Sequence, residues 1–120
     1  MRETSQIVLM LAKIRKAKEL YESPNISQQD ALKLREFERE ERLAVPNYAL
    51  AHFDRIEALG TAGIAAVIDG KCSSCGTSIN QDELDYLTTN NIGVCEKCFA
   101  YTYKPNPKID LDKFFKEYLK

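Results

Sequence analysis

The stretch that decides the fold is Asp69–Tyr103, DGKCSSCGTSINQDELDYLTTNNIGVCEKCFAYTY, which contains every cysteine of the chain. The cysteines form two C-x-x-C pairs, Cys72 with Cys75 and Cys95 with Cys98, with nineteen residues between the pairs. This spacing is typical of four-cysteine zinc sites. Two such loops facing one point complete the tetrahedron of sulfur ligands that Zn²⁺ prefers. The spacing therefore predicts one structural zinc ion held by all four thiolates.

Three other interpretations of the cysteines stay open: redox C-x-x-C motifs, a pair of disulfides, or unconnected buried thiols. A redox motif is expected in a βαβ setting, and none is visible. Disulfides are typical of secreted chains, and no signal peptide is recognisable. A catalytic zinc keeps one ligand position open, whereas four cysteines fill all positions, so we expect a closed site. His52, the single histidine, is expected to be an ordinary helix residue and not a ligand.

The two cysteine loops differ in the residue that follows each pair. Gly76 follows the first pair, where a loop closing around a metal often needs positive φ, which glycine adopts without steric cost. Phe99 follows the second pair, so the two loops are not symmetric in sequence.

Length and composition are those of an ordinary small protein. The chain has 120 residues, of which 44% are hydrophobic and 29% charged, and its formal net charge is −1. A strongly basic nucleic-acid binder is not indicated. No apolar run approaches the roughly 18–20 residues that a membrane-spanning helix needs. We expect no membrane association and a cytoplasmic, reducing location, which suits metal-bound thiolates.

Apolar periodicity predicts three helices before the cysteines, at about residues 5–22, 27–44 and 47–59. Ser23-Pro24-Asn25 separates the first two, and Ser27 is a suitable N-cap for the second. Val45-Pro46 ends or kinks that helix, because the residue before proline avoids the α region. The first two helices are expected to form an antiparallel hairpin or coiled-coil arm, and residues 1–59 are assigned to this helical arm.

The remaining residues predict a small zinc ribbon and a final helix. Ile64–Ile68 is expected to be a buried strand that pairs with Tyr101–Tyr103, with a short helix at Asp82–Leu87 between the cysteine pairs. The ribbon is assigned to residues 60–104, and residues 105–120 to a linker and a C-terminal amphipathic helix capped by Asp110. The expected fold class is α+β, mostly α.

The stretch from Val45 to Tyr103 resembles the bacterial C4-type zinc-ribbon family, whose members carry a coiled-coil hairpin ahead of the ribbon. The segments that carry the resemblance are LAHFDRIEAL, GIAAVIDGKCSSCGTSI, QDELDYL and VCEKCFAYTY. The resemblance implies metal-ligand roles for Cys72, Cys75, Cys95 and Cys98, and a function in binding and not in catalysis. After the last cysteine the family has glycine and a basic residue, where this chain has Phe99 and Ala100.

The leading hypothesis of function is a non-enzymatic adaptor that binds a protein partner, in transcription or its regulation. Between Asp69 and Lys104 five acidic residues oppose three basic ones, a net charge of −2, whereas phosphate binding favours a basic surface. An enzyme is not indicated, because there is no phosphate loop, no open metal position and no catalytic set around the single histidine. Homo-oligomers through the helical arm are a further expectation.

Two alternatives have other partners. A nucleic-acid-binding ribbon would use basic residues of the first or last helix, with Tyr101 and Tyr103 stacking on bases. A regulator that inserts its hairpin into RNA polymerase would resemble the bacterial coiled-coil zinc-finger regulators, which have acidic hairpin tips. In this chain the tip, Glu22–Asp30, has acids only at its two ends.

The candidate partner-binding residues lie on the first and last helices. The first helix combines basic residues with an apolar stripe, and the last helix carries an apolar face. That face either docks on the same chain or binds a partner, and the sequence leaves both open. The residues are Lys13, Ile14, Arg15, Lys16, Phe114, Phe115 and Tyr118.

Overall fold

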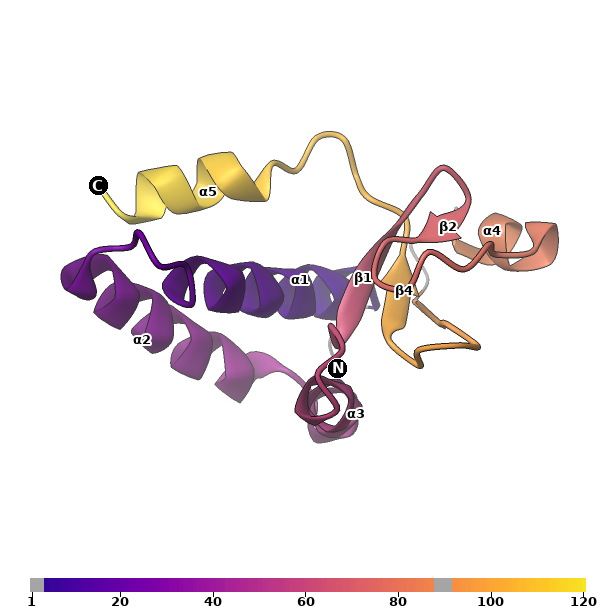
Figure 1. The fold of residues 1–120 in the computed structure, drawn as a ribbon, viewed down its shortest axis with the longest axis horizontal. Helices are drawn as coiled ribbons and strands as arrows, with labels where there is room; N and C mark the ends of the chain where they lie inside the picture. Colours follow the sequence, from indigo (N-terminus) through magenta and orange to yellow (C-terminus); the bar gives the residue numbers. More distant parts are fainter. Residues whose placement is uncertain (1–3, 88–91) are drawn as a thin grey trace.

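A computed structural model describes residues 4–87 and 92–120 of the chain. Within these ranges it contains five helices and one four-stranded sheet, an α+β fold with mostly helical residues (Figure 1). The helices are α1 Thr4–Tyr21, α2 Gln28–Ala44, α3 Asn47–Ala58, α4 Gln81–Leu87 and α5 Leu111–Tyr118. The strands are β1 Ile64–Ile68, β2 Lys71–Cys72, β3 Gly93–Val94 and β4 Tyr101–Tyr103. None of the helices in the described ranges has the length and apolar content needed to cross a membrane.

Capping and proline signals place the helix ends close to where the sequence predicts them. Ser27 caps α2, since its side chain accepts a hydrogen bond from the backbone N–H of Asp30. Asp110 caps α5 in the same way, accepting from the backbone N–H of Lys113. Val45 is extended and precedes Pro46, which separates α2 from α3. These local signals fix the helix boundaries because each satisfies or removes a free backbone group at a helix end.

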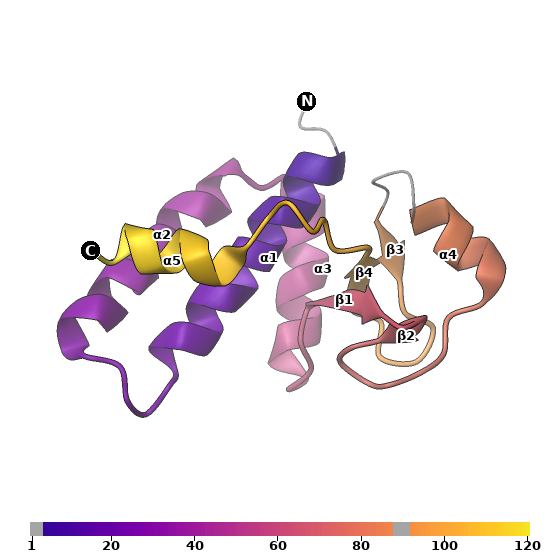
Figure 2. The ribbon, with the colours of Figure 1, turned by 90° about the horizontal axis from the view of Figure 1, so that it is seen from above.

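Helix α1 lies at the centre of the helical layer, which we define as α1, α2, α3 and α5. It forms the predicted hairpin with α2 and also contacts α3, α5 and β1 (Figure 2). The part of α1 up to Ile14 contributes to an apolar cluster shared with α3 and β1, whose buried members are Ile7, Leu11, Ile14, Val45, Ala49, Phe53 and Ile64. The rest of α1 enters another cluster, in which Ala17, Leu34 and Phe115 are buried between α1, α2 and α5. The apolar stripes of the helices are therefore largely satisfied within the chain.

Helix α5 docks on the α1–α2 hairpin, which settles a question that the sequence left open. Three of its aromatic rings surround Phe37 of α2 at centroid distances of 5.2–5.8 Å, namely Phe114, Phe115 and Tyr118. The rings meet edge to face, the arrangement that aromatic quadrupoles favour. The hairpin is thus covered by a third helix along part of its length.

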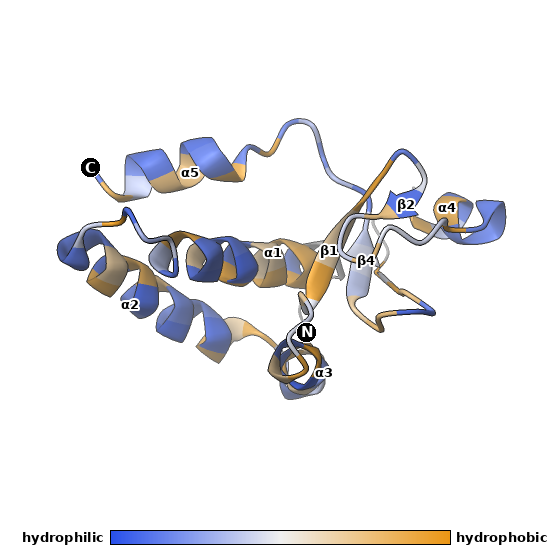
Figure 3. Cartoon of the chain, viewed as in Figure 1, coloured by the Kyte–Doolittle hydropathy of each residue, from blue (hydrophilic) through white to orange (hydrophobic). Residues whose placement is uncertain are grey.

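The sheet has the strand order β2-β1-β4-β3 and is the frame of the cysteine module, which we define as residues 64–103. Strands β1 and β4 pair, as predicted, and they run parallel, with Ile64 opposite Tyr101. Asp69 and Gly70, both with positive φ, form the tight turn that joins β1 to its antiparallel neighbour β2. Figure 3 shows the apolar character of β1, which lies between the helical layer and the rest of the module.

Gly63 sets how closely the module approaches the helical layer. A Cβ atom at this position would lie 2.6 Å from Cδ2 of Phe53 on α3 and 2.8 Å from the Phe53 carbonyl oxygen. Only glycine allows this approach without displacement of α3. The Gly63 carbonyl accepts a hydrogen bond from the backbone N–H of Tyr101, so the close approach and the start of the β1–β4 pairing occur at one residue.

Candidate metal centre

The two cysteine loops are built from the same set of backbone hydrogen bonds. In the first loop, Gly76 N–H donates to the Cys72 carbonyl at 2.8 Å and Cys72 N–H donates to Thr77 at 2.9 Å. In the second loop, Phe99 N–H donates to the Cys95 carbonyl at 3.0 Å and Cys95 N–H donates to Ala100 at 2.9 Å. Each loop is therefore a closed turn, here called a knuckle, that holds both of its cysteines on one side.

Both knuckles need a left-handed residue at the position after their second cysteine. Gly76 has φ 77° and Phe99 has φ 63°. Glycine adopts this conformation freely, whereas a residue with a Cβ atom is held there at a cost of roughly 1–3 kcal/mol. The asymmetry visible in the sequence is therefore an asymmetry of strain between two otherwise equivalent loops.

The four sulfur atoms converge between the knuckles, and all lie within 4.8 Å of one another. Across the two loops, the Sγ atoms of Cys72 and Cys98 are 3.8 Å apart, and those of Cys75 and Cys95 are 3.5 Å apart. A tetrahedron with metal–sulfur bonds of about 2.3 Å has sulfur–sulfur edges of about 3.8 Å. A disulfide bond is much shorter, about 2.05 Å. The spacing thus fits a single metal ion, and no disulfide bond joins the four cysteines.

Burial and hydrogen bonding move the thiol pKa values in different directions. Burial raises the pKa of Cys98 to about 12 and also raises the pKa of Cys72. Hydrogen bonds from the Thr77 hydroxyl and then from its backbone N–H lower the pKa of Cys75 to about 6. Four neighbouring thiolates repel one another unless a cation lies between them. A divalent ion would supply that charge and hold all four as thiolates, so the chemistry of the donor set fits a metal.

The elements that position the ligands come from both ends of the module. Cys72 ends β2 and is fully buried against β1, and Cys95 directly follows β3 and is also buried. Cys75 is exposed and Cys98 is partly exposed. The last two line a cleft of about 560 Å³ between α1 and the first knuckle, which also includes Arg15, Lys16 and Tyr103 among its lining residues.

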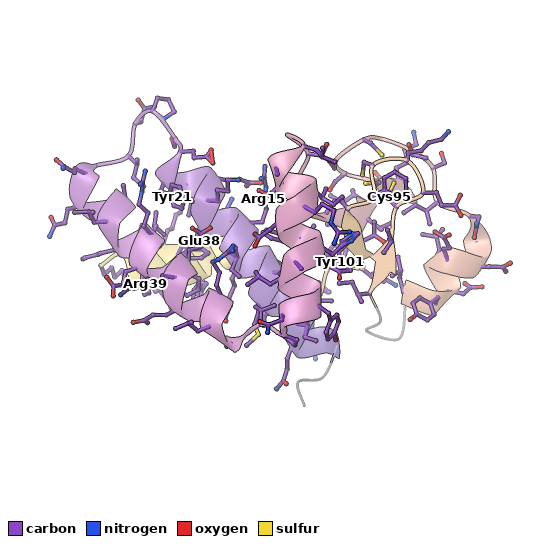
Figure 4. All side chains as sticks on the ribbon, turned by 90° about the horizontal axis from the view of Figure 1, so that it is seen from below. Arg15, Tyr21, Glu38, Arg39, Cys95 and Tyr101 are labelled. Atoms are coloured by element: carbon purple, nitrogen blue, oxygen red, sulfur yellow. The ribbon has the colours of Figure 1, made fainter. Side chains whose placement is uncertain are left out.

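His52 contacts the second knuckle. It is not one of the side chains that could hold the metal ion, which among the described residues are the four cysteines. Its Nε2 atom lies 2.7 Å from the carbonyl oxygen of Phe99, and its ring centroid lies 4.5 Å from that of Tyr101. Tyr101 lies beside α3 in Figure 4, on the same side as Cys95. The residues after each cysteine pair single out Phe99 in the sequence, but no sequence signal predicts its contact with His52, which lies 47 positions away.

Glu57 of α3 pairs with two of the basic residues of α1, Arg15 and Lys18. Its carboxylate accepts hydrogen bonds from Arg15 at 2.8 and 2.9 Å, from Lys18 at 2.8 Å, and from the backbone N–H of Gly63. Arg15 lies between α1 and α3 in Figure 4. No local sequence signal identifies this group, because Glu57 is about forty residues away from both basic partners.

The structure brings most of the candidate partner-binding residues together, at the contact between α1 and α5. Lys13 Nζ lies 4.3 Å from the centre of the Phe114 ring, and Lys16 forms an ion pair with Asp112 at 2.8 Å. The Tyr118 hydroxyl donates to the Lys33 carbonyl of α2.

Two of the candidates need correction, because Ile14 and Phe115 are buried in the two helical clusters and present no side-chain surface. An apolar stripe on a helix predicts that the stripe is covered, but it does not distinguish packing within the chain from packing against a partner.

Fold and site together define a small α+β protein whose four cysteines are arranged to hold a single metal ion. Comparison with protein-family models and with curated proteins gives no match. A solved chain from Mycobacterium smegmatis has a similar fold, with a TM-score of 0.54 and 18% sequence identity. The likeness covers 64% of this chain and 34% of that chain, so this protein spans about a third of its length. At this identity the likeness shows the fold alone.

Proposed function

We propose that this chain is a non-enzymatic zinc-ribbon adaptor, in which one structural Zn²⁺ stabilises a platform for a protein partner. The observation that carries the proposal is the convergence of four sulfur atoms at tetrahedral spacing from two matching knuckles. Four thiolates are typical ligands of structural zinc, and they occupy every coordination position of the ion. A metal held in this way contributes to folding and offers no site for substrate or water.

The charges of the chain support a protein partner over nucleic acid. Three of the four basic residues of α1 already have acidic partners, since Arg15 and Lys18 pair with Glu57 and Lys16 pairs with Asp112. The module between Asp69 and Lys104 carries a net charge of −2 before the thiolates are counted. Binding to phosphates draws on available cations, so this distribution disfavours it.

Exposed apolar side chains at the two ends of α3, on Tyr48 and on the C-cap residue Leu59, also support a protein partner. Tyr48 and Leu59 are 71% and 74% exposed, although both are large and apolar. They lie eleven residues apart, about three helical turns, so they share one face of the helical segment with His52 and Arg55. A partner surface is expected there, in place of the α1–α5 contact that the sequence indicates. A role in transcription or its regulation is part of the same proposal.

The test combines metal analysis with a binding experiment. Purified protein is expected to contain one zinc ion per chain, and cell lysate passed over the immobilised protein should yield a specific protein partner. Tyr48→Asp should abolish capture, whereas Leu32→Asp, at an exposed apolar position on α2, should not. Random DNA and RNA are tested in parallel over a range of salt. Tight, strongly salt-dependent nucleic-acid binding without a captured protein would overturn the proposal in favour of a nucleic-acid-binding ribbon.

A further inference from the structure

We propose that His52 is a positioning residue of the metal centre, holding the second knuckle in its left-handed conformation from outside the module. The proposal rests on metal binding by the four cysteines. It assigns a role in the centre to a residue of α3, twenty positions before the first cysteine.

The two knuckles have equivalent backbone hydrogen bonds, but a different residue occupies the left-handed position in each. Gly76 adopts φ 77° with no steric cost, and nothing lies within 4 Å of the position a Cβ atom would occupy. Phe99 adopts φ 63° with a full side chain that is 55% exposed. The exposed ring gains little packing, so the strain at Phe99 must be balanced elsewhere.

The hydrogen bond from His52 offsets the backbone strain at Phe99. This hydrogen bond joins Nε2 of His52 to the carbonyl oxygen of Phe99, the strained residue itself, at 2.7 Å. A carbonyl oxygen only accepts, so Nε2 carries the proton and donates. The same residue's N–H donates to Cys95, so the Phe99 backbone is held on both sides of its Cα atom. Within the described residues, the first knuckle shows no such side-chain bond at the Gly76 carbonyl.

The imidazole is itself held by packed elements. The opposite face of α3 buries Ala49, Phe53 and Ile56, which fixes the helix against α1 and β1. The His52 ring lies against Tyr101 of β4, tilted by 49°. Outer residues that orient metal ligands typically change metal affinity by 10–100-fold when they are altered. His52 should therefore act on metal release through the position of Cys95 and Cys98.

The experiment measures the rate of Zn²⁺ transfer from the 120-residue chain to an excess of a chromophoric chelator. His52→Ala removes both the donor and the ring, His52→Phe keeps the ring contact without the donor, and His52→Gln keeps a donor near the Nε2 position. We expect release to be about tenfold faster in the first two variants and close to the unaltered rate in His52→Gln. Ala51→Ser, at an exposed position of α3 next to His52, is the control and should release zinc at the unaltered rate.

Repeating the measurement in a Phe99→Gly variant distinguishes this positioning role of His52 from a general loss of stability. Phe99→Gly makes the second knuckle equivalent to the first, so His52→Ala should change release less than twofold in that background. A tenfold effect in both backgrounds, or fast release from His52→Gln with slow release from His52→Phe, would overturn the proposal. Failure of metal binding itself would appear separately, as absence of zinc in the unaltered protein.

Discussion

The helical layer and the cysteine module differ in the side chains that they bury. The largest fully buried side chains of the helical layer are Phe53, Phe115, Leu11, Ile14 and Leu34. The buried cluster of the module consists of Ala65, Cys72 and Cys95, with Ile79 and Cys98 packed against it. Free energy from apolar burial scales with the area removed from water, so the helical layer gains far more from it. The module instead contains four cysteines arranged to hold a single metal ion.

One chain can therefore contain two regions that are stabilised by different interactions and are sensitive to different changes. The apolar clusters respond to loss of volume, and the metal centre responds to loss of a ligand or of the ion. Three experiments test whether the two regions are separable, beginning with the largest expected effect.

Metal removal should unfold the module while α1, α2 and α5 remain helical. Structural zinc contributes on the order of 10 kcal/mol or more to the folding of small domains, and the part of the module that the structure describes has no large apolar core to replace it. Cys95→Ser should have the same effect as a chelator. Amide exchange measured with and without metal should show loss of protection in β1, while circular dichroism retains most of its helical signal. Unchanged protection of Ile64–Ile68 after verified metal removal would contradict the expectation.

Leu34→Ala should weaken the helical layer and leave the metal centre intact. Leu34 is fully buried between α1, α2 and α5, and truncation of a buried leucine typically costs about 2–5 kcal/mol. Urea unfolding in the presence of zinc should shift to lower concentration, with an unchanged metal content. Leu32→Ala, at an exposed position two residues away, is the matched control and should shift the midpoint little. Loss of zinc from Leu34→Ala at low urea would mean that the two regions are not separable.

The sequence predicts those parts of the fold that depend on local signals. Ser27, Val45-Pro46 and Asp110 mark helix ends through capping and backbone restriction, and they mark them correctly. The cysteine spacing predicts the convergence of four sulfurs because a metal imposes the same geometry on any such pair of loops. The division into regions at residues 59 and 104 stays a prediction.

The contacts that the sequence misses join residues distant in the chain. Glu57 meets Arg15 and Lys18 only because α3 crosses α1, and His52 meets Phe99 across 47 positions. The parallel direction of β4 also depends on the path of the whole module between the two strands. Apolar periodicity correctly indicates that Ile14 and Phe115 are covered, but it does not say by which chain.

Glu57→Gln should have the smallest effect of the three, and it tests the junction between the two regions. The Glu57 side chain is 7% exposed, and its carboxylate neutralises Arg15 and Lys18 while accepting from Gly63 N–H at the entrance to β1. A neutral amide keeps one acceptor but directs its N–H groups toward these cations. Water reaches both cations, whose side chains are about 30% exposed, so we expect a loss of about 1–3 kcal/mol in the free energy of unfolding.

Asp54→Asn breaks the more exposed pair with Arg42 and should cost at most about 1 kcal/mol. Urea unfolding of both variants in zinc-saturated buffer gives the comparison. Equal midpoints would show that Glu57 does not join the layer to the module, and that the contact of Phe53 with Gly63 carries the junction instead.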